Sequence, residues 1–431
     1  MNAPDPSLRA TLQLLPFRAV RYDPTVSDLG AVLAPPYDVI DESEQKQLEA
    51  SDPHNVVRLI LPRDPAEPGI VDRYDLAATT FNAWLDAALL AVDHKPALYV
   101  YQQSAAGVVI QRGLLGAVVM QPLDSGVILP HENVRSGPVE DRLSLMRAIG
   151  GNPEPIFLLY DGGGATTAIS ETATAREPLA SAITPDGIVH ELWAITDGSE
   201  LDAISADLAS RSAMIADGHH RYTTYGYLRD ELHAAGKGSG PWDAGLTLLV
   251  DDSVATPDIR AIHRVLPGLT LDAAVEAASK AFRVARLETA ADDVDGALRL
   301  LAQQSGPAFL LSDGRSFTLL CDPDADQLAV ARPPHRSMAW WALDASIAGV
   351  FVMEHLWGVT DTVGVVEAEH DPAAALHLAR DESGIALLLN PAPLAGIFAV
   401  ARAGEAMPRK STLFMPKPRS GLVMRAFRFE S

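Results

Sequence analysis

Hydrophobic positions along the chain follow helix-like and strand-like spacings in turn, and the two kinds of segment are interleaved throughout. In residues 74–91 apolar side chains recur three or four positions apart, which predicts a long amphipathic helix. Short apolar runs bounded by polar and turn residues predict strands, as in residues 108–119 and 156–160. Because the order is irregular and hairpins are frequent, the pattern favours an α+β fold with mixed sheets and flanking helices.

The remaining expected elements follow from the same spacings. Asp41, followed by Glu44 three residues later, resembles a capping box and opens a short helix. Further helices are expected over residues 139–149, 201–210, 271–282, 292–304 and 337–357. Further strands are expected over residues 17–20, 97–102, 214–216, 246–250, 283–287, 308–312 and 316–321.

The pattern of expected helices and strands changes near residue 270, after a Pro-Gly pair. We therefore expect an α+β core over residues 16–270 and a smaller α+β part over residues 271–431. The longest uncharged stretch, residues 383–401, is interrupted by prolines, and we expect two strand-length pieces there rather than a membrane span. The N-terminus has no apolar signal region, so the sequence predicts a cytoplasmic protein.

Composition narrows the classes of partner. The chain carries 34 basic and 56 acidic residues, a net charge of −22. This balance argues against nucleic acid and against an anionic membrane surface, because both are bound by basic surfaces. Cys321 is the only cysteine, so an intrachain disulfide is impossible. Cys321 lies in an apolar run, and we expect it to be a buried core residue.

The most informative stretch is a predicted strand, turn and helix around Asp217, Gly218, His219, His220 and Arg221. A helix N-terminus presents N–H groups and a positive dipole end to a phosphate. Gly218 allows a sharp turn and Arg221 can bind phosphate oxygens, while the Asp217 side chain can cap the helix. Either histidine can donate to phosphate or shuttle a proton. A capped helix with surface histidines, or a zinc site, are the alternatives.

A second polar cluster lies where a strand leads into a helix. It contains His131, Glu132 and Arg135, with Arg142 further along. Glu132 is a candidate general base, and Arg135 or Arg142 is a candidate phosphate ligand. The alternative is a loop held together by salt bridges.

Two more segments carry candidate residues. Pro35 and Pro36 hold the backbone extended and present Asp38 on a stiff loop, where its carboxylate suits a metal or substrate contact. Near the C-terminus, Lys410 and Lys417 belong to a basic stretch in an otherwise acidic chain, which suits a small anionic ligand. The alternative for the Pro35-Pro36 segment is a purely structural turn. The alternative for the basic stretch is surface charge without a binding role.

Taken in order, these motifs resemble the bacterial and archaeal family known as domain of unknown function 1015. The resemblance spans nearly the whole chain, and the Asp-Gly-His-His-Arg block is its most specific part. The chain departs from the family pattern at His263, where Asn is frequent, and at Asn133, where Thr is frequent. The matching segments are residues 35–39, 131–132, 155–158, 215–221, 263–265, 410–412 and 416–417.

The Asp-Gly-x-His-Arg turn is also similar, more distantly, to the phosphate-binding turn of the ParB/sulfiredoxin-like superfamily. That group includes nucleotide-binding partition proteins, sulfiredoxins and free-serine kinases. The resemblance implies a nucleotide-dependent phosphotransferase acting on a small hydroxyl substrate such as free serine, with ATP or ADP as co-substrate and Mg²⁺ as cofactor. Residues 217–221 would hold the phosphates with Arg135, Lys410 and Lys417. His131, Glu132 and Asp38 would be catalytic, Asp38 also holding the metal. A nucleotide-binding regulator and a metal-dependent hydrolase using His131, His219 and His220 are the alternatives.

Overall fold

A computed structural model describes residues 10–23, 25, 28–65, 72–290 and 292–430. The chain divides into two compact units: unit 1 is Met1–Pro257 with Pro416–Ser431, and unit 2 is Asp258–Met415. This division differs from the predicted domains, because it falls before residue 270 and the chain then returns to unit 1. The N-terminal residues on which the prediction of localisation depends lie outside the described residues.

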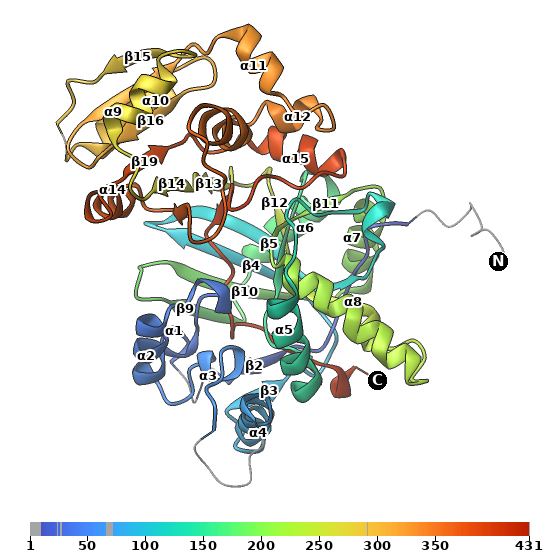
Figure 1. Ribbon diagram of the computed structural model, residues 1–431. Helices are drawn as coiled ribbons and strands as arrows, with labels where there is room; N and C mark the ends of the chain where they lie inside the picture. The colour runs from blue at the N-terminus through green and yellow to red at the C-terminus, as the bar shows by residue number, and fades with distance from the viewer. Residues whose placement is uncertain (1–9, 24, 26–27, 66–71, 291, 431) are drawn as a thin grey trace. The chain divides into compact units, whose positions relative to one another are not determined.

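Unit 1 is built on a nine-stranded mixed sheet (Figure 1). Its strands are β1 (Leu14–Leu15), β4 (Leu98–Ala105), β5 (Val108–Val119), β6 (Ile128–Leu129), β8 (Ile156–Tyr160), β9 (Ala180–Ile183), β10 (Val189–Ile195), β11 (Ala213–Asp217) and β12 (Ala244–Asp251). The order is β6-β11-β8-β12-β5-β4-β10-β9, with β1 beside β5. The β6–β11 and β8–β12 pairs are parallel and the others are antiparallel. Two short ribbons pair β2 (Val20–Tyr22) with β3 (Leu90–Val92) and β7 (Gly151–Asn152) with β21 (Arg425–Ala426).

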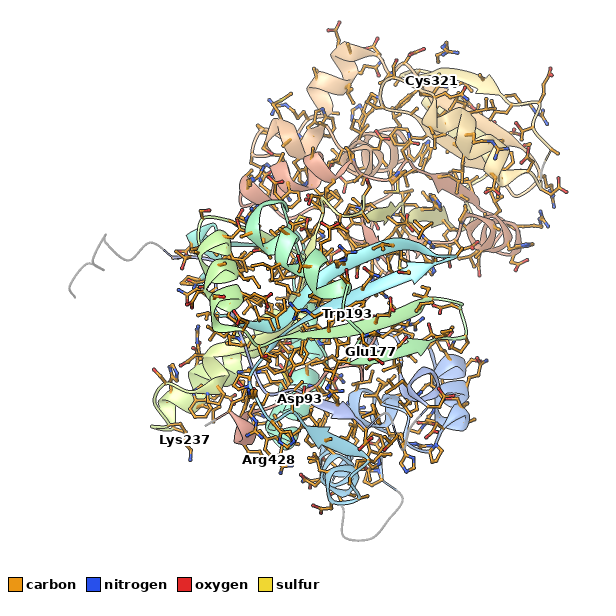
Figure 2. All side chains as sticks on the ribbon, turned by 180° about the vertical axis from the view of Figure 1, so that it is seen from behind. Asp93, Glu177, Trp193, Lys237, Cys321 and Arg428 are labelled. Carbon is orange, nitrogen blue, oxygen red and sulfur yellow. The ribbon has the colours of Figure 1, made fainter. Side chains whose placement is uncertain are left out.

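Helices flank this sheet. They are α1 (Leu29–Val32), α2 (Glu42–Ser51), α3 (Val57–Ile60), α4 (Arg73–Asp86), α5 (Ser136–Ile149), α6 (Gly164–Thr174), α7 (Gly198–Leu208) and α8 (His219–Ala234), with 3-10 turns η1 (Tyr37–Val39), η2 (Leu123–Ser125), η3 (Pro241–Asp243) and η5 (Phe427–Phe429). Helix α5 packs against α8, and α6 against α7 (Figure 1). Ile156 and Ile215 of neighbouring strands lie in the hydrophobic core of unit 1 with Trp193, which Figure 2 labels.

The predicted helix over residues 74–91 is confirmed as α4, which ends earlier than expected. Asp72 caps it by accepting hydrogen bonds from the N–H groups of Tyr74 and Asp75. Ala88 adopts a positive φ of 56°, which ends the helical path, and Leu90–Val92 forms β3. The apolar spacing past residue 86 therefore belongs to a turn and a strand.

Unit 2 contains a six-stranded antiparallel sheet in the order β15-β17-β16-β19-β14-β18. Its strands are β14 (His263–Leu266), β15 (Arg283–Arg286), β16 (Phe309–Ser312), β17 (Phe317–Cys321), β18 (Glu367–Glu369) and β19 (Ile385–Leu388), and β13 (Asp258–Arg260) pairs separately with β20 (Leu413–Met415). Its helices are α9 (Leu271–Ala278), α10 (Val294–Ala302), α11 (Ala325–Ala331), α12 (Met338–Trp341), α13 (Asp344–Ile347), the π-helix η4 (Ala348–Leu356), α14 (Pro372–Asp381) and α15 (Leu394–Arg402). Cys321 is buried in the core of unit 2, as predicted (Figure 2).

Two predictions for unit 2 are wrong in detail. The single helix expected over residues 337–357 is broken, because Leu343 is extended between α12 and α13. The second piece of the uncharged stretch 383–401 is the helix α15, with Pro393 at its N-cap, where the missing proline N–H costs little. The fold class itself is confirmed as α+β with mixed sheets and flanking helices. Within the described residues, no helix has the length and apolar character needed to cross a bilayer.

Candidate functional site

The predicted strand, turn and helix are present as β11, Gly218 and α8. Gly218 occupies the N-cap position, directly after Asp217, and the predicted capping by the Asp217 side chain stays a prediction. Gly218 has a φ of 92°, and a Cβ there would lie 3.0 Å from Cγ2 of Ile156. Both the backbone angle and the space therefore require glycine. Glycine has no side chain to offer as a cap to the first turn of α8.

The Asp217 carboxylate, which is mostly buried, joins two cations. Nη2 of Arg221 donates to Oδ2 of Asp217 at 2.5 Å, and Nζ of Lys417 forms an ion pair with Oδ1. Burial opposes the charge on Lys417, but Asp217 and Asp38 outweigh it and raise the pKa of Lys417. Three predicted residues from distant parts of the sequence, Asp217, Arg221 and Lys417, therefore meet at this turn.

Arg221 is enclosed rather than open to a ligand. Its residue exposure is 1%, and Nη1 donates to the carbonyl oxygen of Pro155 at 2.5 Å. Burial alone would lower the pKa of Arg221, but Glu154 and Asp217 raise it, so the guanidinium stays charged. In the structure Arg221 is enclosed and fixes the Asp217 carboxylate, while its predicted role as a phosphate ligand stays a prediction.

Glu154 is a buried carboxylate beside this turn that the sequence did not single out. It is 1% exposed, accepts a hydrogen bond from the N–H of Tyr37 at 3.0 Å, and accepts another from the Ser420 hydroxyl at 3.1 Å. Nη1 of Arg142 lies 3.6 Å from Oε2 of Glu154. Burial raises the pKa of Glu154, while Arg221 and Arg142 lower it. A single carboxylate between two prolines, directly before an apolar strand, was the available signal.

Arg142, the other candidate phosphate ligand, is also internal. It is 2% exposed; Nη1 donates to the carbonyl oxygen of Ile60 at 2.5 Å, and Nη2 donates to Asp141 at 2.5 Å. Its guanidinium carbon lies 3.9 Å from the centre of the Tyr37 ring. In the structure Arg142 packs against Tyr37 and bonds to Ile60 and Asp141, and its predicted role as a phosphate ligand stays a prediction.

The Pro-Pro loop leads to the same site. It ends in η1, where Asp38 is exposed and Tyr37 is bonded to Glu154 as described. The charge of Asp38 raises the pKa values of both Arg221 and Lys417, so its carboxylate lies near both cations. A rigid loop therefore presents an exposed carboxylate beside the first turn of α8.

The two histidines of the turn hold the loop that carries Glu132. Nε2 of His219 accepts a hydrogen bond from the N–H of His131 at 3.2 Å, and Nε2 of His220 accepts one from the N–H of Arg135 at 3.0 Å. An imidazole whose Nε2 accepts carries its proton on Nδ1 when neutral. In His219 this Nδ1 lies 3.9 Å from Oε2 of Glu132. The geometry makes His219 and His220 positioning residues.

Both buried imidazoles are neutral. Burial lowers the pKa of His131 to about 4, and burial together with His131, His220 and Lys417 lowers the pKa of His219 well below 6.5. His131 is 1% exposed, and its predicted catalytic role stays a prediction. The Arg135 side chain is exposed, and its backbone rather than its guanidinium holds His220.

These neutral histidines should make stability depend on pH. In the unfolded chain His219 takes up a proton near pH 6.5, but in the folded protein it does so only at a much lower pH. Unfolding therefore becomes more favourable as the pH falls below 6.5. The free energy of unfolding of the wild type should therefore fall between pH 6.5 and pH 5.5. In His219→Gln we expect this fall to be about 1 kcal/mol smaller. Urea unfolding at the two pH values measures it, with exposed His94→Gln as the control. If the free energy of unfolding changes by the same amount between the two pH values in the wild type, His219→Gln and His94→Gln, then His219 is not buried in the neutral form.

The family is identified by the comparison of the sequence with known families. The model of the family described as protein of unknown function DUF1015 matches residues 14–346. The chain belongs to this family. The match takes in the whole turn at residues 217–221 and ends before Lys410 and Lys417. The chain matches none of the curated proteins.

Several solved structures are similar to this member of the DUF1015 family. SbnI from Staphylococcus aureus, truncated at its C-terminus, is 13% identical with a TM-score of 0.36, covering 72% of this chain and 86% of SbnI. A free serine kinase in complex with AMP is 14% identical with a TM-score of 0.31, covering 71% of this chain and 88% of the kinase. A conserved hypothetical protein from Pyrococcus furiosus is 12% identical with a TM-score of 0.32, covering 73% of this chain and 94% of the Pyrococcus furiosus protein.

One further predicted residue lies in unit 2 of this DUF1015 protein. Lys410 is exposed, has a φ of 52°, and its carbonyl oxygen accepts a hydrogen bond from Nη1 of Arg264 at 3.1 Å. Arg264 also pairs with Asp361, its Nε lying 2.9 Å from Oδ2. Of the two predicted lysines, Lys417 is thus the one that contacts Asp217.

Metal ligation has limited support in this DUF1015 protein. Across the described ranges, no group of three or more His, Cys, Asp or Glu side chains is placed to hold a metal ion. The Nε2 atoms of His219 and His220 already accept backbone hydrogen bonds, so a histidine metal site would have to break both. The arrangement therefore does not support the metal-dependent hydrolase.

Proposed function

We propose that this protein is a nucleotide-dependent phosphotransferase acting on a small hydroxyl substrate, with free serine as the first candidate. One observation carries the proposal: the glycine-capped N-terminus of α8 lies beside the Lys417 ammonium. Helix N–H groups and an ammonium are the usual protein partners of nucleotide phosphates. The β-strand before the turn and the buried Arg221–Asp217 pair hold both groups in place before a ligand arrives.

We assign the roles from the charge and the position of each group. The N–H groups after Gly218 and Nζ of Lys417 would contact the phosphates of ATP or ADP. Asp38, which is exposed, would hold Mg²⁺, and the metal would supply neutralisation of phosphate charge. Glu132 would orient or deprotonate the acceptor hydroxyl; its side chain is 37% exposed. Arg221 and the two histidines would act indirectly, by fixing Asp217 and the Glu132 loop.

A nucleotide-binding regulator without transfer chemistry is the second candidate. The observation that favours it is the enclosure of Asp217, the carboxylate nearest the turn, between Arg221 and Lys417. This pairing leaves the transfer step dependent on Glu132. The two candidates therefore differ in one measurable property, the effect of Glu132 on product formation.

The test is incubation of the purified protein with Mg²⁺, ATP or ADP, and serine, with phosphoserine detected by ³¹P NMR. We expect Glu132→Gln to lower the rate of product formation by about 10²–10⁴-fold while nucleotide affinity stays the same. Glu140→Gln, an exposed substitution of the same kind in α5, is the matched control and should keep the wild-type rate.

Three outcomes separate the proposals. Absence of phosphoserine with either nucleotide refutes the serine kinase. Nucleotide binding that persists in both wild type and Glu132→Gln without product supports the regulator. Binding that does not change in Lys417→Met refutes the role given to Lys417 in both candidates.

A further inference from the structure

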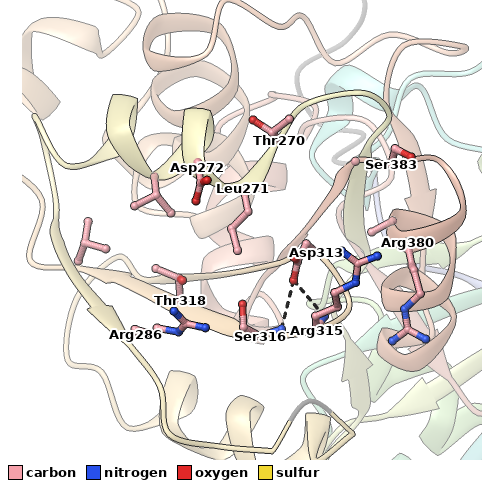
Figure 3. A pocket seen from close by; sticks show the side chains of 14 residues that line it. Thr270, Leu271, Asp272, Arg286, Asp313, Arg315, Ser316, Thr318, Arg380 and Ser383 are labelled. Atoms are coloured by element: carbon pink, nitrogen blue, oxygen red, sulfur yellow. Dashed lines mark hydrogen bonds between the residues drawn. The ribbon is translucent and has the colours of Figure 1, made fainter.

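A cavity of about 550 Å³ lies in unit 2, within the size range of small-molecule sites (Figure 3). One wall is the start of α9, where Leu271 and Val275 contribute aliphatic side chains. The facing wall is formed by β15 and β17, through Arg286 and Thr318. None of the lining residues belongs to the turn at residues 217–221, so this cavity is independent of the proposed kinase site.

The lining of this cavity is basic. It includes three arginines, Arg286, Arg315 and Arg380, and two aspartates, Asp272 and Asp313. Among the described residues, none of the three arginines forms an ion pair. These three arginines therefore have no carboxylate of the described residues within ion-pair distance, although the chain carries 34 basic and 56 acidic residues.

The aspartates are placed so that they do not neutralise these arginines. Oδ1 of Asp313 accepts hydrogen bonds from the N–H groups of Arg315 at 3.0 Å and Ser316 at 3.1 Å, which fixes the turn between β16 and β17 (Figure 3). Asp272 lies in the first turn of α9, where the helix dipole stabilises a negative charge. Of the three guanidinium groups, those of Arg286 and Arg315 have neither aspartate within ion-pair distance and can bind an external anion.

The end wall of the cavity is held by the backbone. Nη2 of Arg380 donates to the carbonyl oxygen of Gly314, which ties the end of α14 to the β16–β17 turn. Gly314 has a φ of 76°, so the turn has the tight geometry that glycine permits. In the strand register Arg286 lies opposite Thr318, which sets a guanidinium and a hydroxyl side by side. The cavity is thus built from fixed elements and is not a gap between loose side chains.

We propose that this cavity binds a small organic anion, a carboxylate or phosphate attached to a short aliphatic part. Arg286 and Arg315 would contact the anionic oxygens, since guanidinium groups bind both carboxylate and phosphate through paired hydrogen bonds. Leu271 and Val275 would cover the aliphatic part. The function of this site stands apart from the phosphotransferase and does not depend on it.

The test uses isothermal titration calorimetry of the full chain with two probes in separate arms, succinate and inorganic phosphate. We expect saturable binding of at least one probe, and a dissociation constant raised about tenfold or more in the double variant Arg286→Gln, Arg315→Gln. The matched control is Arg283→Gln, on the same strand, where Nε pairs with Asp322 at 2.7 Å outside the cavity. The arm that binds more tightly identifies the anionic group.

A second measurement needs no variant. Arginine modification by phenylglyoxal, mapped by mass spectrometry, should slow at Arg286 and Arg315 when the bound probe is present, and should be unchanged at Arg283. The proposal is overturned if neither probe binds saturably, if Arg283→Gln weakens binding as much as the double variant does, or if the probe protects all three arginines equally.

Discussion

Replacing Arg221 by methionine is expected to destabilise unit 1 by about 3–5 kcal/mol, because the buried carboxylates of Asp217 and Glu154 would each lose one of the cations beside them. Asp217 would lose its hydrogen bond of 2.5 Å to Nη2, and Glu154 would lose the charge that opposes the rise of its pKa. The free energy of unfolding from urea denaturation of unit 1 measures the effect. Arg142 alone, 3.6 Å from Glu154, does not replace the lost charge beside Asp217.

Two further proteins make this prediction specific. Arg229→Met removes an arginine from the same helix, where Nη2 pairs with Asp230 at 2.8 Å on the surface, and should cost less than about 1 kcal/mol. The double variant Arg221→Met, Glu154→Gln should lose less than the sum of the two single variants, because both charges leave together. An Arg221→Met protein as stable as Arg229→Met would show that the buried network contributes nothing.

Replacing Gly218 by alanine is expected to destabilise unit 1 by about 1–3 kcal/mol, because a side chain is strained at this backbone angle. The φ is 92°, and the new Cβ would meet Ile156 at 3.0 Å and Nε of Arg221 at 3.2 Å. The first turn of α8 would have to shift, and with it the N–H groups proposed to bind phosphate. Nucleotide affinity should therefore fall together with the free energy of unfolding.

Gly226→Ala supplies a control of opposite sign within the same helix. Gly226 lies in the interior of α8, and a Cβ there would meet no other atom within 4 Å. Alanine at an interior helix position should raise the free energy of unfolding by about 0.5–1 kcal/mol and leave nucleotide affinity unchanged. If the two alanine variants change stability in the same direction, the special geometry of Gly218 is not a source of strain.

The turn at residues 217–221 could be predicted from the sequence, but which of its side chains are buried and which are exposed could not. An apolar run followed by Asp-Gly and a polar helix start predicts a strand, a turn and a helix, and all three are present. Nothing local distinguishes an arginine that faces solvent from one that turns inward. Arg221 is enclosed because Pro155 and Asp217 accept from it, and Pro155 lies far away in the sequence.

Local sequence also could not show that the long helix expected over residues 337–357 is broken. Its apolar content is correct, yet the backbone is extended at Leu343 and continues as the π-helix η4. Spacing alone indicates which residues are buried; it does not report a break whose position depends on what packs around it. The predicted boundary near residue 270 differs for a related reason, since the chain returns to unit 1 at Pro416.

The return of the chain to unit 1 also has a consequence for biosynthesis. Lys417 follows all of unit 2 in the sequence, so a ribosome completes residues 258–415 before it adds the cation that pairs with Asp217. Strand β21, which pairs with β7, is made later still. A nascent chain that has formed the other strands of the large sheet still lacks the Lys417–Asp217 ion pair. The order of translation thus leaves the turn at residues 217–221 without this cation until residue 417 has been added.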